Sequence, residues 1–381
     1  AALETPALVV DLDRMERNLD RAAAYAAGHG LALRPHVKTH KSPGIAAQQL
    51  ARGAAGLTCA TPREAEVMSA VGDDLLVAYP PVGPARLRRL LALPRRVRLT
   101  VALDSLGAIE SLAAGAREAG RPVGVYVELD AGMGRVGVAS DDELVALARC
   151  VAGSAPLELR GIAFYPGHVR GPAAEQDEAL ARVAERLERA VAALARAGLR
   201  PPVVSGGSTP TLWRSHELPQ VTEIRPGTYV YNDRTTAAIG ACAWADCAAS
   251  VLATVVSTAV PGQAVVDAGT KALGREPIRG VEGAGLHGAG TAGYGALLDR
   301  PDVAVTALSE EHGTLDLSHT DWRPAVGEQV RIVPNHVCVA VSTFDVAYGL
   351  RGERIETAWP IAARGREADP AARVAAPGAR V

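Results

Sequence analysis

The sequence predicts a (β/α)8 barrel of the α/β class, followed by a C-terminal all-β domain. From the N-terminus to about residue 230, short β-branched runs alternate with amphipathic helical stretches. Eight candidate strands fall in this region, which favours a closed barrel over an open doubly wound sheet. After about residue 245 the helical period disappears, and β-rich runs with Gly- and Pro-containing breaks take its place.

The predicted barrel strands are short and mostly apolar. Several are continuous apolar runs, such as residues 75–78, which is typical of strands buried on both faces of a parallel sheet. The candidate strands are 31–34, 56–60, 75–79, 98–103, 123–130, 159–165, 202–205 and 221–224.

Caps and stops predict the helix boundaries between these strands. Residues 61–64 read Thr-Pro-Arg-Glu, which combines an N-cap, a proline at the first helical position and a capping-box glutamate. Ser42 and Pro43 open another helix in the same way, and Gly53 closes it. The longest helical pattern runs from 173 to 198, with leucines and valines along one stripe.

The predicted β domain also takes in the N-terminus of the chain. The run from Pro6 to Val10 precedes the first barrel helix and makes a ninth candidate strand, which can pair with this domain. We therefore assign residues 12–240 to the barrel and residues 1–11 plus 241–381 to the β domain, with a loosely held tail after about residue 364. The β-rich runs are 250–260, 264–267, 303–309, 329–333 and 337–343.

Composition argues against several classes of partner. With 40 basic and 42 acidic residues the net charge is -2, which gives no electrostatic footprint for nucleic acid or an anionic membrane. No stretch approaches ~18 uninterrupted apolar residues, and no basic segment followed by an apolar run opens the chain, so neither membrane insertion nor targeting is expected. The five cysteines are odd in number and scattered, which favours a reducing, cytoplasmic location.

A cluster of basic residues, Arg-Pro-His-Val-Lys-Thr-His-Lys at 34–41, follows the first barrel strand. In this fold the carboxyl ends of the strands carry the active site. Neighbouring cations disfavour the ammonium form of Lys38, which leaves a nucleophilic amine suited to Schiff-base chemistry. Taken by itself, the segment fits a basic surface loop equally well.

Four further polar or glycine-rich segments follow later barrel strands. One of them places Arg135 at the rim of the barrel. Glycines and hydroxyls after the last two strands are what a barrel phosphate site requires, although glycines also simply turn chains. Five such segments at five strand ends together predict one site. The four are 130–135, 164–168, 205–211 and 225–229.

In the β domain, His336 and Cys338 form a candidate metal pair. Residues i and i+2 of a strand point to one face, so the two side chains can converge on one ion. A packed histidine near a buried cysteine explains an isolated His-x-Cys as well. Because only two protein ligands are visible, substrate or water would fill the other positions, as in a catalytic metal site.

Taken in order, the segments RPHVKTHK, DAGMGRVGV, SGGSTPT, RPGTY, SEEHG and PNHVC resemble the D-serine dehydratase/D-threonine aldolase family over nearly the whole chain. These are fold-type III pyridoxal-phosphate enzymes with an alanine-racemase-like barrel and a C-terminal β domain. The resemblance implies pyridoxal 5'-phosphate, a divalent metal and a head-to-tail homodimer in which one chain's β domain completes the other's site.

The resemblance also implies a role for each motif residue. Lys38 would form the internal aldimine, Arg135 would hydrogen-bond the phenolic oxygen of the cofactor, and Tyr165 would lie near its pyridine nitrogen. The implied metal ligands are His336 and Cys338. The implied phosphate ligands are Ser208, Thr209, Gly227 and Thr228.

The metal motif bears on the type of reaction. Aldolases of this family typically carry His-x-Asp and use manganese or magnesium, whereas the dehydratases carry His-x-Cys and use zinc. The soft thiolate of Cys338 favours zinc over manganese or magnesium, although residues 339–345 are typical of neither group. We therefore expect zinc-assisted β-elimination from a D-3-hydroxy amino acid such as D-serine, D-threonine or D-threo-3-hydroxyaspartate, giving a 2-oxo acid and ammonia.

Three alternatives stay open at this point. Retro-aldol cleavage to glycine and an aldehyde would use the same cofactor and metal. An amino-acid racemase would need a second base, for which Tyr294 and Tyr348 are candidates without a typical motif around them. A cofactor-carrying homeostasis protein on the same barrel would usually lack the β domain.

Overall fold

The computed structural model describes residues 3–281 and 293–365. Eight parallel strands form one sheet in the order β2-β9-β8-β7-β6-β5-β4-β3. The strand positions agree with the sequence expectation to within a few residues. Their bounds are β2 Ala32–Leu33, β3 Leu57–Cys59, β4 Asp74–Val77, β5 Arg98–Leu103, β6 Val123–Leu129, β7 Leu157–Phe164, β8 Val203–Gly206 and β9 Glu223–Ile224.

The two ends of this sheet meet just beyond β2. His36 and Thr58 form a parallel bridge there. The backbone N–H of Val37 donates to the carbonyl of Thr58 (2.9 Å), and the N–H of Thr58 donates to the carbonyl of Pro35 (2.8 Å). These bonds join the first and last strands of the order, and the predicted (β/α)8 barrel is confirmed.

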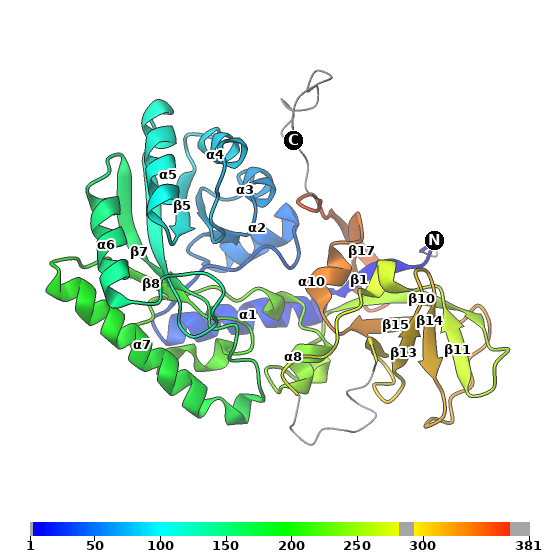
Figure 1. Cartoon of the computed structure of the whole chain (residues 1–381). Helices are drawn as coiled ribbons and strands as arrows, with labels where there is room; N and C mark the ends of the chain where they lie inside the picture. The colour runs from blue at the N-terminus through cyan, green and yellow to red at the C-terminus, as the bar shows by residue number, and fades with distance from the viewer. Residues whose placement is uncertain (1–2, 282–292, 366–381) are drawn as a thin grey trace, which may run out of the picture.

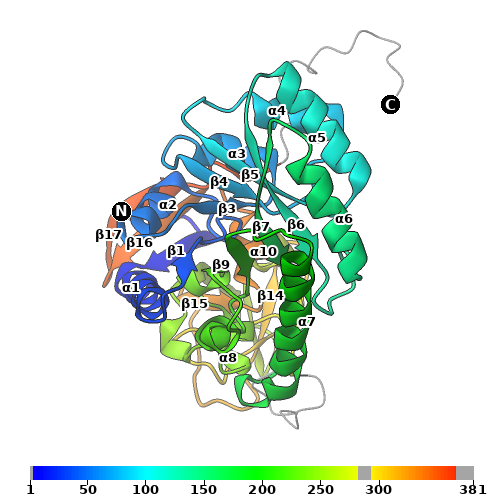
Figure 2. The same cartoon turned by 90° about the vertical axis from the view of Figure 1, so that its left-hand side faces the viewer.

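Helices cover the outside of the barrel (Figures 1 and 2). Thr61 caps α3 by accepting a hydrogen bond from the N–H of Glu64 (3.1 Å), as its sequence predicts. The longest helix, α7, buries its leucine and valine stripe against the barrel. The helices are α1 Leu12–Gly28, α2 Pro43–Ala51, α3 Pro62–Met68, α4 Pro84–Leu91, α5 Leu106–Glu118, α6 Asp141–Ala152, α7 Asp177–Arg196 and α8 Arg234–Ala238.

The C-terminal part is built on a second, mainly antiparallel sheet with the order β13-β14-β11-β10-β1-β16-β17, in which β15 pairs with β10 and β12. β1 (Ala7–Asp11) runs antiparallel to β10 and parallel to β16, so the start of the chain belongs to this sheet. The other bounds are β10 Ala249–Ser257, β11 Gln263–Val266, β12 Gly295–Leu297, β13 Val305–Leu308, β14 Gly313–Asp316, β15 Gln329–Pro334, β16 Val346–Arg351 and β17 Arg354–Pro360.

One strand expectation in this part is wrong. The run at 337–343 is not a strand, because β15 ends at Pro334 and α10 (Val337–Val341) follows with His336 as its N-cap. A short apolar run fits a buried helix as well as a buried strand. A tertiary contact decides between them here, since the carboxylate of Asp233 accepts the first N–H of the helix, that of Val337 (3.1 Å).

Two other differences are smaller. Strands β12, β14, β16 and β17 were not expected, and a short helix, α9 (Thr270–Leu273), interrupts the β-rich region.

Nearly all of the tail predicted to be loosely held, residues 366–381, lies outside the described residues. Within the described ranges, no helix is both long and apolar enough to span a bilayer.

A buried ion-pair network fills the barrel interior. The guanidinium of Arg34 donates from Nε to Glu223 (2.6 Å) and pairs with Asp74 (2.9 Å). Ser205 donates to the other oxygen of Glu223 (2.6 Å) and also accepts from Arg225. The network therefore connects Asp74, at the start of β4, with Arg225, which directly follows β9.

Replacing Arg34 with methionine is expected to lower the free energy of unfolding by about 3–5 kcal/mol, because it leaves the buried carboxylate of Glu223 without its ion-pair partner, whereas Asp74 keeps its ion pair with Arg98. Urea denaturation would measure the loss. As a control, Arg200→Met removes an exposed arginine after α7 and should change the free energy of unfolding by no more than about 0.5 kcal/mol. Equal losses in the two variants would contradict the assignment.

Candidate active site

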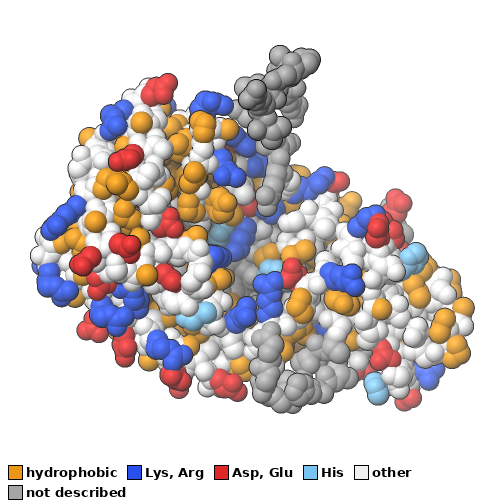
Figure 3. Space-filling model, viewed as in Figure 1, with side chains coloured by type: hydrophobic (Ala, Val, Ile, Leu, Met, Phe, Trp, Pro, Cys, Tyr) orange, Lys and Arg blue, Asp and Glu red, His pale blue; other side chains and the backbone are white. Residues whose placement is uncertain are grey.

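A cavity of about 570 Å³ opens at the carboxyl ends of the barrel strands, next to the C-terminal part. On the face that Figure 3 shows, basic side chains gather around the hollow between the two parts. Every site residue that the sequence singled out lines this one cavity. They are Lys38, Arg135, Tyr165, Ser208, Thr209, Gly227, Thr228, His336 and Cys338.

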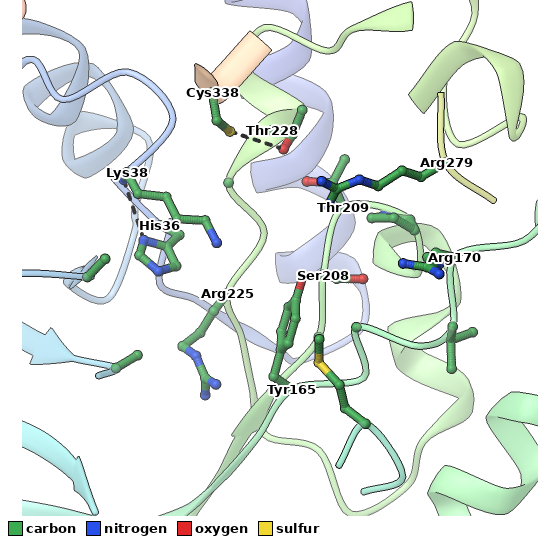
Figure 4. A pocket seen from close by; sticks show the side chains of 18 of the residues that line it. His36, Lys38, Tyr165, Arg170, Ser208, Thr209, Arg225, Thr228, Arg279 and Cys338 are labelled. Carbon is green, nitrogen blue, oxygen red and sulfur yellow. Dashed lines mark hydrogen bonds between the residues drawn. The ribbon is translucent and has the colours of Figure 1, made fainter. Parts of the chain in front are cut away.

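Lys38 enters the cavity from a tight turn just after β2 (Figure 4). The neighbouring Thr39 and His40 are fully buried, so the segment is not a basic surface loop. The chain has three lysines, and the other two are ion-paired, Lys41 with Glu64 and Lys271 with two glutamates. Within the described ranges the Nζ of Lys38 has no ion pair, which makes it the free amine of this site.

The ring of Tyr165 lies near both Lys38 and Arg135. The Nζ of Lys38 is 5.9 Å from the centroid of its ring, and the guanidinium carbon of Arg135 is 4.7 Å from it. The loop that carries Arg135 is ordered by Asp130, whose carboxylate accepts the backbone N–H groups of residues 132–134 (2.9–3.1 Å). Arg135 is therefore positioned by its loop before any ligand binds.

Two acidic residues in the cavity wall received no role from the sequence. Glu128, near the end of β6, is 4% exposed, and its Oε2 has no hydrogen-bond partner among the described residues. Burial raises the pKa of this carboxyl group, although Arg225 and Arg135 oppose the shift. A buried, unpartnered polar atom in a cavity wall fits a ligand that carries a polar group. The lone carboxylate in the apolar strand 123–129 was the available signal.

The loops after β8 and β9 form a cradle for an anion. The backbone N–H groups of Gly227 and Thr228 have no acceptor in the described part of the chain. A Cβ at Gly227 would lie 2.9 Å from the Oγ1 of Thr39, so only glycine fits there. Thr209 ties the two loops together by accepting the N–H of Tyr229 (3.1 Å). Free N–H groups and close backbone approach are what a phosphate requires.

His336 and Cys338 converge in the same cavity, although they lie at the start of α10 and not on a strand. The Sγ of Cys338 is 3.2 Å from the Oγ1 of Thr39, the residue after Lys38. Burial would raise the pKa of this thiol, but His336, with help from Lys38 and Thr39, lowers it to about 7. A thiolate beside an imidazole is a donor set that fits zinc.

Asp233 holds the imidazole in place, and the sequence gave it no role. One carboxylate oxygen accepts the N–H of Thr236 (2.8 Å) and caps α8, while the other lies 3.2 Å from the Nδ1 of His336. Asp233 is fully buried. The pattern Asp-x-x-Thr at 233–236 predicts a helix cap, but nothing local indicates the contact with His336, which is 103 residues away.

Within the described ranges, no group of three or more His, Cys, Asp and Glu side chains is arranged to hold a metal ion. A metal on His336 and Cys338 would therefore keep positions open for water or substrate, as in a catalytic site.

Other candidates from the sequence lie elsewhere. Neither Tyr294 nor Tyr348, the candidate racemase bases, lines the cavity of this chain. The SEEHG segment of the resemblance, residues 309–313, also lies outside the cavity, where the carbonyl of Ser309 accepts the N–H of Thr270 (2.9 Å).

Two sequence families match this chain. The family described as "Alanine racemase, N-terminal domain" matches residues 10–235, which is more than half of the chain. The family described as "Putative serine dehydratase domain" matches residues 248–350.

The chain is similar over nearly its whole length to named dehydratases and aldolases. D-threo-3-hydroxyaspartate dehydratase from Delftia sp. (strain HT23) is 37% identical, with 94% of this chain and 97% of that protein covered. 3-hydroxy-D-aspartate aldolase from Paracoccus denitrificans (strain Pd 1222) is 32% identical, with 96% and 93% covered. The crystal structure of D-threonine aldolase from Filomicrobium marinum has a TM-score of 0.85 at 33% identity, with 95% of each chain covered.

Two of the similar solved structures are variants of D-threo-3-hydroxyaspartate dehydratase. Each is 36% identical to this chain, with TM-scores of 0.85 and 0.84. One replaces a histidine with alanine, and the other replaces a cysteine two positions later and is described as metal-free. From these matches, the chain belongs to the family of the D-threo-3-hydroxyaspartate dehydratases and D-threonine aldolases, which is built on the alanine racemase N-terminal domain.

Proposed function

We propose that this protein is a pyridoxal-phosphate- and zinc-dependent lyase that eliminates water from a D-3-hydroxy amino acid and releases a 2-oxo acid and ammonia. One observation carries the proposal. A free amine on Lys38 and a His336–Cys338 pair line the same cavity of one chain, with Thr39 linking the lysine segment to the sulfur. The names of the relatives, dehydratase and aldolase, agree with a lyase.

The residues that line the cavity fit the cofactor along its whole length. The amine of Lys38 is available for covalent attachment, Arg135 for the phenolic oxygen and Tyr165 for the neighbourhood of the ring nitrogen. The unpartnered oxygen of Glu128 is available to a polar group of the cofactor. When bound, the cofactor supplies an electron sink for the carbanion at Cα. The phosphate would lie among Ser208, Thr209, Gly227 and Thr228, two of which offer free backbone N–H groups.

Residues of the chain itself would carry out proton transfer and metal binding. The Nζ of Lys38 takes the Cα proton as general base. His336 and Cys338 would hold the metal, which would supply Lewis-acid assistance to the departing hydroxyl group. Asp233 fixes the imidazole so that its other nitrogen is free for the metal. The thiolate favours zinc, with manganese or magnesium as the alternatives.

Two further points belong to the same proposal. Since the metal pair and Lys38 line one cavity of one chain, the head-to-tail homodimer would serve to enclose the site. All five cysteines are free, which is compatible with the reducing cytoplasm that we propose as the location.

Retro-aldol cleavage is the second candidate, because relatives about as similar as the dehydratase are named aldolases. Product analysis separates the two reactions. Purified protein would be incubated with D-serine, D-threonine or D-threo-3-hydroxyaspartate, each with zinc and with manganese. We expect 2-oxo acid and ammonia, fastest with zinc. Glycine and an aldehyde would instead establish the aldolase.

The Asp233→Asn variant is expected to bind zinc about 10- to 100-fold more weakly, because the amide no longer fixes the imidazole as the carboxylate does. Competition with a chromophoric chelator would measure the affinity without relying on turnover. Ser140→Ala is the matched control, since it removes the cap of α6 outside the cavity and should leave zinc affinity unchanged. Unaltered affinity in the Asp233 variant would rule out the positioning role.

A further inference from the structure

The proposed cofactor site is built from two segments that lie far apart in the chain. The turn after β2 carries Lys38, and the loop after β9 carries the anion cradle at Gly227 and Thr228; Lys38 and Thr228 line the same cavity (Figure 4). The N–H of His36 donates to the carbonyl of Pro226 (2.9 Å), which joins the two backbones just before each of these residues. A second connection, made of side chains, joins the same two segments beyond Lys38.

This second connection is a chain of three buried polar side chains. His40 belongs to the turn, Gln49 to α2 and Tyr229 to the loop after β9, and none of them is more than 3% exposed. The Nε2 of His40 lies 3.2 Å from the Oε1 of Gln49, and the Nε2 of Gln49 donates to the hydroxyl oxygen of Tyr229 (3.0 Å). None of the three lines the cavity, so the chain can act on a ligand only through the segments that it joins.

The protonation of His40 fixes the direction of each hydrogen bond in this chain. Burial lowers the pKa of the imidazole to about 4, although its hydrogen bonds to Gln49 and Ser42 oppose the shift. The ring is therefore neutral at neutral pH and carries one proton. The N–H of Ser42 donates to Nδ1 (3.1 Å), so the proton is on Nε2 and is donated to Gln49. Gln49 thus accepts at one end and donates to Tyr229 at the other, which requires an amide.

The turn and the cradle also pack closely enough for a shift of one to be felt by the other. A Cβ at Gly227 would lie 2.9 Å from the Oγ1 of Thr39, the residue after Lys38, and 3.1 Å from the carbonyl oxygen of His36. Lys41, at the end of the turn, has a φ of 54°, a left-handed conformation that a non-glycine residue keeps only where its surroundings hold it. The position of the amine relative to the cradle therefore depends on the contacts that hold this turn.

We propose that Gln49 is a positioning residue that holds the turn of Lys38 in register with the anion cradle, so that a ligand bound there by its phosphate attaches more readily to the amine. The attachment joins the aldehyde carbon of the ligand to Nζ as a C=N bond and releases one water molecule. A ligand already held at one end reacts as if the amine were highly concentrated, and this advantage depends on the geometry between the two groups. The inference rests on the proposed function and adds to it the residue that links the two ends of the cofactor site.

The Gln49→Met variant of the full chain tests this role, because methionine has nearly the shape of glutamine but lacks the amide. Absorbance titration would give the attachment constants of pyridoxal 5'-phosphate and of pyridoxal, which has no phosphate. We expect the ratio of the first constant to the second to fall by about 10-fold in the variant, the factor that the loss of a buried hydrogen-bond connection gives. Affinity for inorganic phosphate, measured by calorimetry, should stay close to that of the wild type, because the cradle keeps its own N–H groups.

Two further variants separate positioning from a general loss of structure. Gln48→Met changes the neighbouring glutamine of α2, whose side chain has no hydrogen bond within the described ranges and does not line the cavity, so it should keep the wild-type ratio. Tyr229→Phe removes only the hydroxyl group at the far end of the chain and should also lower the ratio. Combined with Gln49→Met it should lower the ratio no further, because the hydroxyl group acts through Gln49.

The other outcomes overturn the assignment. An equal loss for both ligands would mean that Gln49 supports the fold alone. An equal loss for pyridoxal 5'-phosphate and inorganic phosphate would mean that it shapes only the cradle, and an unchanged ratio would mean that it has no bearing on the site. Should Gln49→Met fail to fold, Tyr229→Phe decides, and a wild-type ratio there contradicts the proposal.

None of these measurements uses a substrate, so this inference and the proposed function fail separately. If attachment of the phosphorylated ligand depends on Gln49 but no hydroxy amino acid is turned over, the lyase proposal fails and the positioning role stands. If the wild type releases 2-oxo acid and ammonia while the ratio does not depend on Gln49, the positioning role is wrong and the lyase proposal stands.

Discussion

The Cys338→Ala variant is expected to lose β-elimination by about 10³-fold or more while it retains the cofactor. The reason is that hydroxide is a poor leaving group and needs the Lewis acid that Cys338 helps to hold. The measurement is turnover of D-threo-3-hydroxyaspartate, together with zinc content after dialysis. The cofactor absorbance should stay close to that of the wild type, because Lys38 is untouched.

Two further variants sharpen this result. Cys150→Ala removes a free, partly buried cysteine outside the cavity and should keep wild-type turnover. Cys338→Asp exchanges a soft ligand for a hard one, so activity should return with manganese more than with zinc. Wild-type turnover by Cys338→Ala in zinc-free buffer would remove the metal from the mechanism.

The Lys38→Ala variant is expected to lose activity by about 10⁴-fold, because it removes both the attachment point of the cofactor and the general base. Mass spectrometry after borohydride reduction should find the cofactor on the wild-type chain and not on the variant. Lys271→Ala removes the exposed lysine that pairs with Glu310 and Glu311, and it should behave as the wild type. A reduced adduct on Lys41 or Lys271 of the wild type would show that Lys38 has been misassigned.

Much of this molecule follows from local patterns in the chain. Strand-length apolar runs that alternate with capped amphipathic helices predict the barrel, because both periodicities are set within a few residues. Motifs at the strand ends predict the site, because parallel strands bring their carboxyl ends to one face of the barrel. The amine of Lys38, the glycine cradle at Gly227 and the His336–Cys338 pair were all recognisable in this way.

The conformation of 337–343 was not recognisable in this way. Its apolar residues fit a strand or a helix, and the carboxylate of Asp233, more than a hundred residues earlier, caps it as a helix. His336 and Cys338 still converge, because a helix N-terminus brings the two side chains together as a strand face would have done. The expected convergence of the two side chains is therefore found on a different local structure, and their role as metal ligands stays a prediction.

The sequence by itself determined the barrel and brought to one site the residues that we propose as the reactive lysine, the anion-binding loops and the metal ligands, all of which depend on short-range spacing. The tertiary structure alone decided which carboxylate orients the imidazole and that Glu128 faces the cavity with an unpartnered oxygen. These features depend on contacts between segments far apart in the chain, and no local pattern encodes which charged groups folding will pair and which it will leave for a ligand.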